Sequence, residues 1–173
     1  FKVEGRMKGA FYAATVAKNY REAIDSYIAD PDAYRFDPRW KEELEQMVHR
    51  TYDTGFYFTR PQEDSKVDLE RSYHKEAVVC ARVSRTDGQE IYLSQRNKLR
   101  LGDEVEILRP HGRNLKMTIT RLWDEEHNPI SSTPHAKMHF IMSRDDLIAE
   151  DKAEEIPEGS FVRRDGDKDL AKN

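Results

Sequence analysis

The sequence contains a single cysteine, Cys80, among its 173 residues. A disulfide within the chain needs two cysteines, and an all-cysteine zinc or iron–sulfur site needs more, so the sequence excludes both. No run of about 18 apolar residues is present, which excludes a membrane-spanning helix. The first residues, Phe1 to Arg6, include neither an initiating methionine nor the apolar stretch of a signal peptide. We therefore expect a cytoplasmic segment that begins at an internal cut and has no membrane partner.

An excess of charge of one sign is also missing. Lysine and arginine number 29, aspartate and glutamate number 33, and the net charge is -4 at pH 7. This balance excludes a strongly basic domain, although a local basic patch remains compatible with it. Hydrophobic residues make up 37% of the chain and include 7 Phe, 8 Tyr and 2 Trp. That content favours a folded core under a heavily charged surface over a disordered chain.

Two helices are predicted in the first third of the chain. After Lys8, apolar residues recur every three or four positions, which is the period of an amphipathic helix of about six turns. These residues are Phe11, Ala14, Ala17, Tyr20, Ile24, Tyr27 and Ile28. Asp30-Pro31 ends this helix, because the residue before a proline disfavours helical geometry. Asp37-Pro38 then begins a second helix, with Asp as its cap and Pro in its first turn. The apolar face of that helix consists of Trp40, Leu44, Met47 and Val48.

After Tyr73 the apolar period changes to two, which predicts short β-strands separated by turns. The alternating segments are 77–83, 91–93, 105–107, 117–122, 138–142 and 161–162. Six short antiparallel strands favour a small closed β-barrel, and Thr86-Asp87-Gly88 is the predicted turn between the first two. The expected fold class is therefore α+β. Its expected parts are a mainly helical segment 1–59, a linker 60–73, the barrel 74–165 and a disordered tail 166–173.

Charged residues gather where the chain begins. The four are Lys2, Glu4, Arg6 and Lys8. Phe1 to Glu4 alternate like the end of a strand, and a helix follows. At such a turn, lysine and arginine could hold a phosphate or a carboxylate, and the glutamate could orient a substrate. The alternative is an ordinary polar strand end whose charges are solvated or paired. The four residues are candidate substrate- or phosphate-binding residues.

Histidine and cysteine form no pattern typical of catalysis or metal binding. None of the histidines has the HExxH spacing of a helical zinc site. His135 and His139 lie four residues apart in a region predicted as strand, with no third ligand apparent. Cys80 is flanked by Val79 and Ala81, so we expect a buried structural thiol. We assign no catalytic residue, metal site or cofactor to this segment.

Two further segments allow alternative interpretations. The aromatic stretch Thr54 to Phe58 could stack on bases or hold a peptide, but we favour its packing as core between the helices and the barrel. The charge-rich stretch Ile148 to Glu158 is interpreted as a solvated surface turn.

Parts of the sequence resemble collagenase-like peptidases, peptidase family U32. The similar stretches are Phe1 to Lys8, Tyr20 to Asp25, Thr54 to Phe58, Gly102 to Pro110 and Ser160 to Arg164. The first is similar to the end of that family's catalytic region, and the last two are similar to its C-terminal barrel. The order matches over nearly the whole chain. One departure is Gly9, where the family pattern has serine, so a helix-capping side chain is lost.

The resemblance implies a longer protein with an N-terminal TIM-like barrel, whose last strand would include Phe1 to Glu4. It also implies a C-terminal barrel similar to the second domain of the elongation factor that carries aminoacyl-tRNA. Members of the family are peptidases or act in tRNA and rRNA hydroxylation, with cysteines in the N-terminal part expected to hold an iron–sulfur cluster. The implied partners are that TIM-like domain and either RNA or a peptide substrate. Any hydrolase or hydroxylation activity would belong to the whole protein.

Three functional hypotheses stay open. The favoured one is a C-terminal fragment of a collagenase-like peptidase or RNA-hydroxylation protein, whose barrel assists substrate binding. The second is a stand-alone RNA- or protein-binding barrel without catalysis, which rests on fold analogy. The third is a structural or dimerisation element. Without a TIM-like domain to cover them, Phe11 and Ala14 of the first helix are expected to be exposed and to promote self-association of the fragment.

Overall fold

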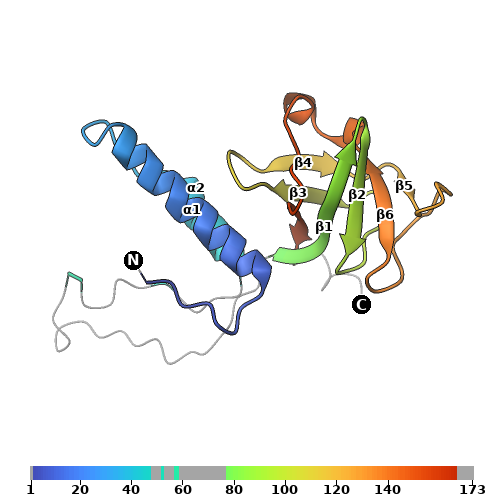
Figure 1. The fold of residues 1–173 in the computed structure, drawn as a ribbon, viewed down its shortest axis with the longest axis horizontal. Helices are drawn as coiled ribbons and strands as arrows, with labels where there is room; N and C mark the ends of the chain where they lie inside the picture. The colour runs from blue at the N-terminus through green and yellow to red at the C-terminus, as the bar shows by residue number, and fades with distance from the viewer. Residues whose placement is uncertain (1, 48–51, 53–56, 59–76, 167–173) are drawn as a thin grey trace.

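The computed structural model describes residues 2–47, 52, 57–58 and 77–166. Figure 1 shows two helices lying beside a curled sheet, with the N-terminal segment leading into the first helix. None of the helices in these ranges is long and apolar enough to cross a membrane.

Helix α1 spans Ala10–Ala29, which confirms the predicted helix, but Ala17, Tyr20, Tyr27 and Ile28 of its predicted apolar face are exposed. It begins after Gly9, which as a glycine supplies no side-chain cap, and it ends at Asp30, directly before Pro31. Thr15, Val16, Lys18 and Asn19 are its buried residues, so its buried face is partly polar.

Helix α2 spans Pro38–Glu45, and its predicted start is confirmed. The Asp37 carboxylate accepts a hydrogen bond of 2.9 Å from the backbone N–H of Arg39, which is the expected capping bond. Trp40 is buried and donates through its indole N–H to Glu22 of α1 at 3.3 Å. Met47 is also buried, whereas Val48 lies outside the described residues.

Seven strands form one antiparallel sheet in the order β4-β3-β7-β1-β2-β6-β5. The strands are β1 Ala77–Asp87, β2 Glu90–Gln95, β3 Glu104–Leu108, β4 Leu115–Thr118, β5 Leu122–Trp123, β6 His139–Ser143 and β7 Phe161–Asp165. The α+β class and the antiparallel pairing are thus confirmed. The segment 117–122 was predicted as one strand, which is wrong, because β4 ends at Thr118 and Leu122 pairs with β6 instead.

The expected closed barrel is also wrong, because the order of the strands is linear, with β4 and β5 at its two edges. β5 is only two residues long and offers β4 little backbone to pair with. The edge of β4 is covered instead by the segment that follows β6. Ile148 donates its N–H to the carbonyl of Lys116 at 3.0 Å, and Met117 forms an isolated bridge with Leu147. The sheet therefore curls into a half-barrel whose β4 edge is protected from pairing with another chain.

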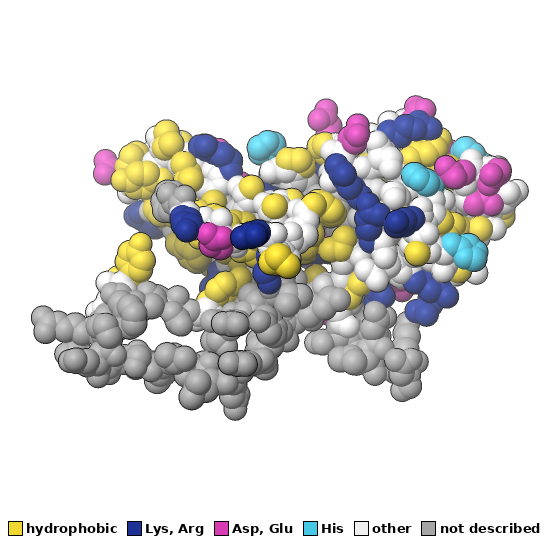
Figure 2. All heavy atoms as spheres, turned by 60° about the horizontal axis from the view of Figure 1, so that its bottom comes forward, with side chains coloured by type: hydrophobic (Ala, Val, Ile, Leu, Met, Phe, Trp, Pro, Cys, Tyr) yellow, Lys and Arg dark blue, Asp and Glu magenta, His cyan; other side chains and the backbone are white. Residues whose placement is uncertain are grey.

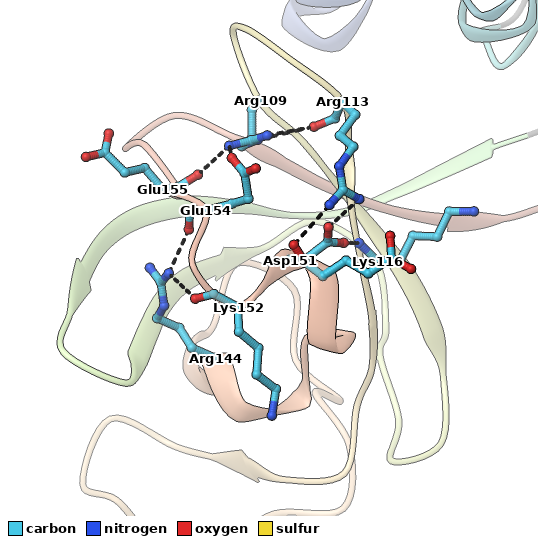
Figure 3. Close-up of polar contacts among 9 residues, drawn as sticks. Arg109, Arg113, Lys116, Arg144, Asp151, Lys152, Glu154 and Glu155 are labelled. Atoms are coloured by element: carbon cyan, nitrogen blue, oxygen red, sulfur yellow. Dashed lines mark hydrogen bonds and ion pairs between the residues drawn. The ribbon is translucent and has the colours of Figure 1, made fainter.

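The interpretation of Ile148 to Glu158 as a solvated turn is wrong for the buried residues of this stretch. Asp151 and Ile156 within it are buried, and two short 3₁₀ turns lie between Arg144 and Asp151. Figure 3 shows how polar contacts attach it to the loop after β3. Arg113 pairs with Asp151, whose other oxygen accepts the N–H of Lys116 at 2.7 Å. Arg109, only 9% exposed, donates to Glu154 at 2.8 Å and to the carbonyl of Arg113. Asp151 and Glu154 are therefore structural anchors, whereas Glu150, Lys152, Glu155 and Glu158 are exposed.

The concave inner face of the sheet holds the core. Alternating strand residues fill it, and Phe140 is the largest of those that are fully buried. Other members are Val83, Ile91, Leu93, Ile107, Leu115, Met117, Met142 and Val162. Because these side chains point inward, the intervening positions of the same strands point to the outer face.

The two helices cover only one end of the outer face. Phe11 of α1 meets Phe161 of β7 edge to face, with ring centroids 5.7 Å apart. Arg163, two residues further along β7, is 4% exposed and donates to Glu43 of α2 at 2.8 and 2.9 Å. Lys18 of α1 donates to the side-chain carbonyl of Asn114 at 2.9 Å. Phe11 was expected to be exposed; it is half-buried, because it packs against the sheet.

Two other expectations differ from the structure. Lys2 to Gly5 form no strand, and Phe1 lies outside the described residues. Tyr57 and Phe58 are 90% and 83% exposed, so packing of the aromatic stretch as core is wrong for these two residues. The other residues of that stretch, the predicted linker 60–73 and the tail 167–173 also lie outside the described part of the chain.

Candidate nucleic-acid interface

The outer side of β1, β2, β6 and β5 is left open by the helices, and the pairing register sets which side chains share it. Arg85 lies opposite Tyr92, Tyr92 opposite Ile141, and Ile141 opposite Trp123. This row crosses four strands and carries an arginine at one end and a tryptophan at the other.

A second row crosses three of these strands. Arg82 lies opposite Ser94, and Ser94 lies opposite His139. Arg82 and His139 are exposed, and Ser94 is partly exposed. We call the side chains of these two rows, without the buried Ile141, the open face. It consists of Arg82, Arg85, Tyr92, Ser94, Trp123 and His139.

A bulge in β1 places both arginines on the same side. Val83 pairs with Leu93 and Arg85 pairs with Tyr92, so Ser84 is an extra residue in the ladder. Strict alternation would turn Arg85 toward the core, since Arg82 already points outward. With the extra residue, Arg85 points outward, and two guanidinium groups share one surface.

Arg85 is held against Tyr92. Its guanidinium carbon lies 3.4 Å from the centre of the Tyr92 ring, and its Nη1 donates to Asp87 at 3.3 Å. The Tyr92 hydroxyl donates to Glu90 at 2.5 Å, and the other Glu90 oxygen lies 3.1 Å from Nε2 of His127. The hydrogen bond from Tyr92 is the main cause that holds the pKa of Glu90 below its usual value. A flat cation is thus fixed on an oriented aromatic ring.

One further positive group lies beside the open face. Arg121 lies 6.0 Å from the ring of Trp123 and also pairs with Asp145 at 3.2 Å. Figure 2 shows Lys, Arg and His side chains spread over the half of the molecule that holds the sheet, with acidic side chains mainly near its margin. Exposed guanidinium groups beside aromatic rings are the groups that contact phosphates and bases in nucleic-acid interfaces.

The residues predicted to bind substrate or phosphate lie elsewhere. Lys2, Glu4, Arg6 and Lys8 are all exposed on the segment before α1. Lys2 and Glu4 form an ion pair of 3.1 Å, and Lys8 lies 5.6 Å from the ring centre of Tyr12. The pair corresponds to the alternative of mutually paired surface charges, and the proposed binding role of the four stays a prediction.

The open face was not predicted from the sequence as a binding surface. One signal pointed to the hairpin that carries Arg85 and Tyr92, the predicted turn at Thr86-Asp87-Gly88. In the structure the turn lies at Gly88-Gln89, because Thr86 and Asp87 still pair with Ile91 and Glu90. The bulge that turns Arg85 outward has no such signal.

The cysteine does not fit an iron–sulfur cluster. Cys80 is fully buried, and burial raises its pKa from 9.0 to about 11, which opposes the thiolate that a metal ligand needs. It is also the only cysteine of the sequence. Groups of three or more potential metal-binding side chains are absent from the described ranges. A cluster would have to be held by other parts of a longer protein.

Comparison with known proteins identifies two matching regions. Residues 75–163 match the profile of the Peptidase family U32 C-terminal domain, and residues 1–67 match that of Peptidase family U32. Among curated proteins, tRNA hydroxylation protein P1 of Bacillus subtilis is 35% identical over 136 residues, covering 78% of this chain and 32% of that protein. tRNA hydroxylation protein P of Escherichia coli is 32% identical over 124 residues, covering 70% of this chain and 26% of that protein.

A solved structure is also similar. It is the C-terminal domain of a U32-family protein from Geobacillus thermoleovorans, with 24% identity, a TM-score of 0.41, and coverage of 50% of this chain and 98% of that one. The chain spans about a third or less of the length of the two curated relatives described above. The two profiles together account for most of the sequence, and the chain belongs to peptidase family U32.

Proposed function

We propose that the sheet of this chain binds RNA through the open face and so holds an RNA substrate for a longer enzyme. The observation that carries the proposal is the row in which Arg85 is stacked on Tyr92 beside Arg82, on an outer surface that the helices leave uncovered.

The chemistry of the open face suits RNA. Arginine guanidinium groups donate several hydrogen bonds in one plane, which matches the oxygens of a phosphate. Tyr92 and Trp123 offer ring surfaces for bases, and both are partly exposed. Some acidic residues are paired away from the open face: Asp151 pairs with Arg113, and Glu43 and Glu106 pair with Arg163.

The relatives support RNA over a peptide as the substrate. Two curated relatives that match more than two thirds of this chain are named tRNA hydroxylation proteins. We extend that substrate class to this chain as part of the proposal. In this proposal, the whole protein is a cytoplasmic enzyme, and a TIM-like domain with its own iron–sulfur cluster catalyses the reaction. The residues that would lie beside that domain are Lys2, Glu4, Arg6 and Lys8.

Filter binding of the whole chain to tRNA tests the proposal. We expect binding that weakens steeply between about 50 and 200 mM salt, because phosphate contacts release counterions. The double variant Arg82→Ala/Arg85→Ala should bind more weakly and lower the salt slope by about two, one for each lost phosphate contact. Arg21→Ala is the matched control, because it removes an exposed arginine of α1 that pairs with Asp25. Equal binding by the double variant and the wild type would reject the open face as the RNA site.

A further inference from the structure

The open face contains a hollow that is lined by both polar and apolar side chains. It has a volume of about 290 Å³ and lies between the outer side of the sheet and the loop after β5. Its lining includes Ser84, Arg85, Tyr92, Glu125, His139 and the buried Ile141. The volume of the hollow is thus close to the lower limit for pockets that bind small molecules, and its walls offer both apolar and polar groups to a ligand.

One wall of the hollow is a preorganised stacking surface. The guanidinium of Arg85 is held by the Tyr92 ring at 3.4 Å and by Asp87 at 3.3 Å. The ring is itself fixed by the bond from its hydroxyl to Glu90. Guanidinium planes stack on nucleobases, and a plane that is already oriented loses little freedom when a base binds. Half of the Arg85 side chain, 54%, remains exposed for such a contact.

The carboxylate of Glu125 limits which groups of an RNA molecule can bind in the hollow. An ionised carboxylate only accepts hydrogen bonds and repels phosphate, so it cannot contact the phosphates of RNA favourably. On a base it can accept from the exocyclic amines of cytosine, adenine or guanine and from the ring N–H of uracil or guanine, and on the sugar it can accept from the 2′-hydroxyl. At the position of the cytosine amine, uracil presents a carbonyl oxygen, which a carboxylate repels. The hollow also excludes a paired base, because bases within an A-form duplex are not accessible to a pocket.

We propose that this hollow takes one unpaired, amino-bearing base of RNA, with cytosine as the test case. The base stacks against Arg85, and Glu125 accepts a hydrogen bond from its exocyclic amine. This inference rests on the proposed function, since the phosphates on either side of the base would be held by the arginines of the open face.

Binding of oligocytidylate and oligouridylate of equal length, followed by fluorescence anisotropy, tests this inference. The whole chain should bind oligocytidylate about tenfold more tightly, the discrimination that one well-formed base contact provides. Glu125→Gln should remove most of this ratio, because its amide can donate to the uracil carbonyl as well as accept from an amine. Glu126→Gln is the matched control: it removes the same charge one residue away, outside the lining of the hollow, and should preserve the ratio. Arg85→Lys should weaken binding of oligocytidylate, since it keeps the charge but loses the stacking plane.

The outcomes separate the two proposals. Salt-dependent binding of both oligonucleotides with equal affinity would overturn the base pocket and leave the RNA-binding face standing. A cytidylate preference that Glu125→Gln and Glu126→Gln change equally would also overturn the pocket. The absence of any binding to oligonucleotides or tRNA at low salt would overturn both.

Discussion

The guanidinium of Arg163 in β7 donates to both oxygens of the Glu43 carboxylate in α2, at 2.9 and 2.8 Å. The same guanidinium also donates to Glu106 of the neighbouring strand at 2.6 and 3.1 Å. Burial opposes the charged form, but Glu43 and Glu106 hold the pKa of Arg163 above its usual value. One arginine thereby ties the helical segment to the sheet.

Removing this arginine should destabilise the chain strongly. Arg163→Met leaves two carboxylates without their cation at a largely buried site, so we expect a loss of about 3–5 kcal/mol in the free energy of unfolding. Urea unfolding measures it. Glu45→Gln, which breaks an exposed pair with Lys41, is the control and should cost less than about 0.5 kcal/mol. A double-mutant cycle with Glu43→Gln isolates the coupling, and additive effects of the two changes would show that the pair does not hold the junction.

Lys18 should make stability depend on pH in the alkaline range. Burial is the main cause that lowers its pKa below the usual 10.5, while Glu22 and Glu43 oppose the shift. Between the folded value and 10.5 the unfolded chain binds more protons, so folding becomes more favourable as pH rises through that window. The wild type should therefore gain stability relative to Lys18→Met as pH rises toward 10.5. A difference that stays constant with pH would contradict the predicted shift.

Cys80 should titrate in the opposite direction and resist alkylation. Its pKa is raised from 9.0 to about 11, mainly by burial, so the unfolded chain releases the thiol proton first. Stability should therefore fall as pH rises from about 9 toward 11, and Cys80→Ala should reduce that fall. Iodoacetamide should modify the thiol in urea but not in the native chain at neutral pH. Rapid labelling of the native chain would show that the strand opens locally.

A shortened chain of residues 75–166 should fold but associate. The core of the sheet lies on its concave side and does not involve the helices. Phe161 and Leu108, however, lie on the outer side that the helices cover, and removal of the helices would expose them. We expect cooperative melting with concentration-dependent sedimentation, which Phe161→Ser should suppress. Loss of cooperative melting would mean that the helices are part of the folding unit.

The helices were predictable because their signals are local. Asp30-Pro31 and Asp37-Pro38 set their limits through backbone geometry alone. The apolar period predicted the helix α1 but not its buried face, which consists of Thr15, Val16, Lys18 and Asn19. The arrangement of the strands was not predictable in this way. β7 lies between β3 and β1, and such pairing depends on contacts between distant parts of the chain that no short pattern records.

The candidate site was less predictable than the fold. The predicted charged residues at the N-terminus were chosen for their proximity in sequence, whereas the open face combines Arg85 of β1 with Trp123 of β5 through two intervening strands. Burial within the segment 148–158 was missed for a related reason. Asp151 is polar by type, and only its pairing with Arg113 and Lys116 allows it to be buried.

The bulge at Ser84 has a consequence for how β1 tolerates changes in length. Loss of the codon for this serine would leave Val83 opposite Leu93 and Arg85 opposite Tyr92, in an uninterrupted ladder. Loss of the codon for Val83 would instead draw Ser84 into the inward position opposite Leu93 and leave a polar side chain in the core. Deletions of these two codons should therefore differ sharply in outcome: the chain without Ser84 should still melt cooperatively, whereas the chain without Val83 should not.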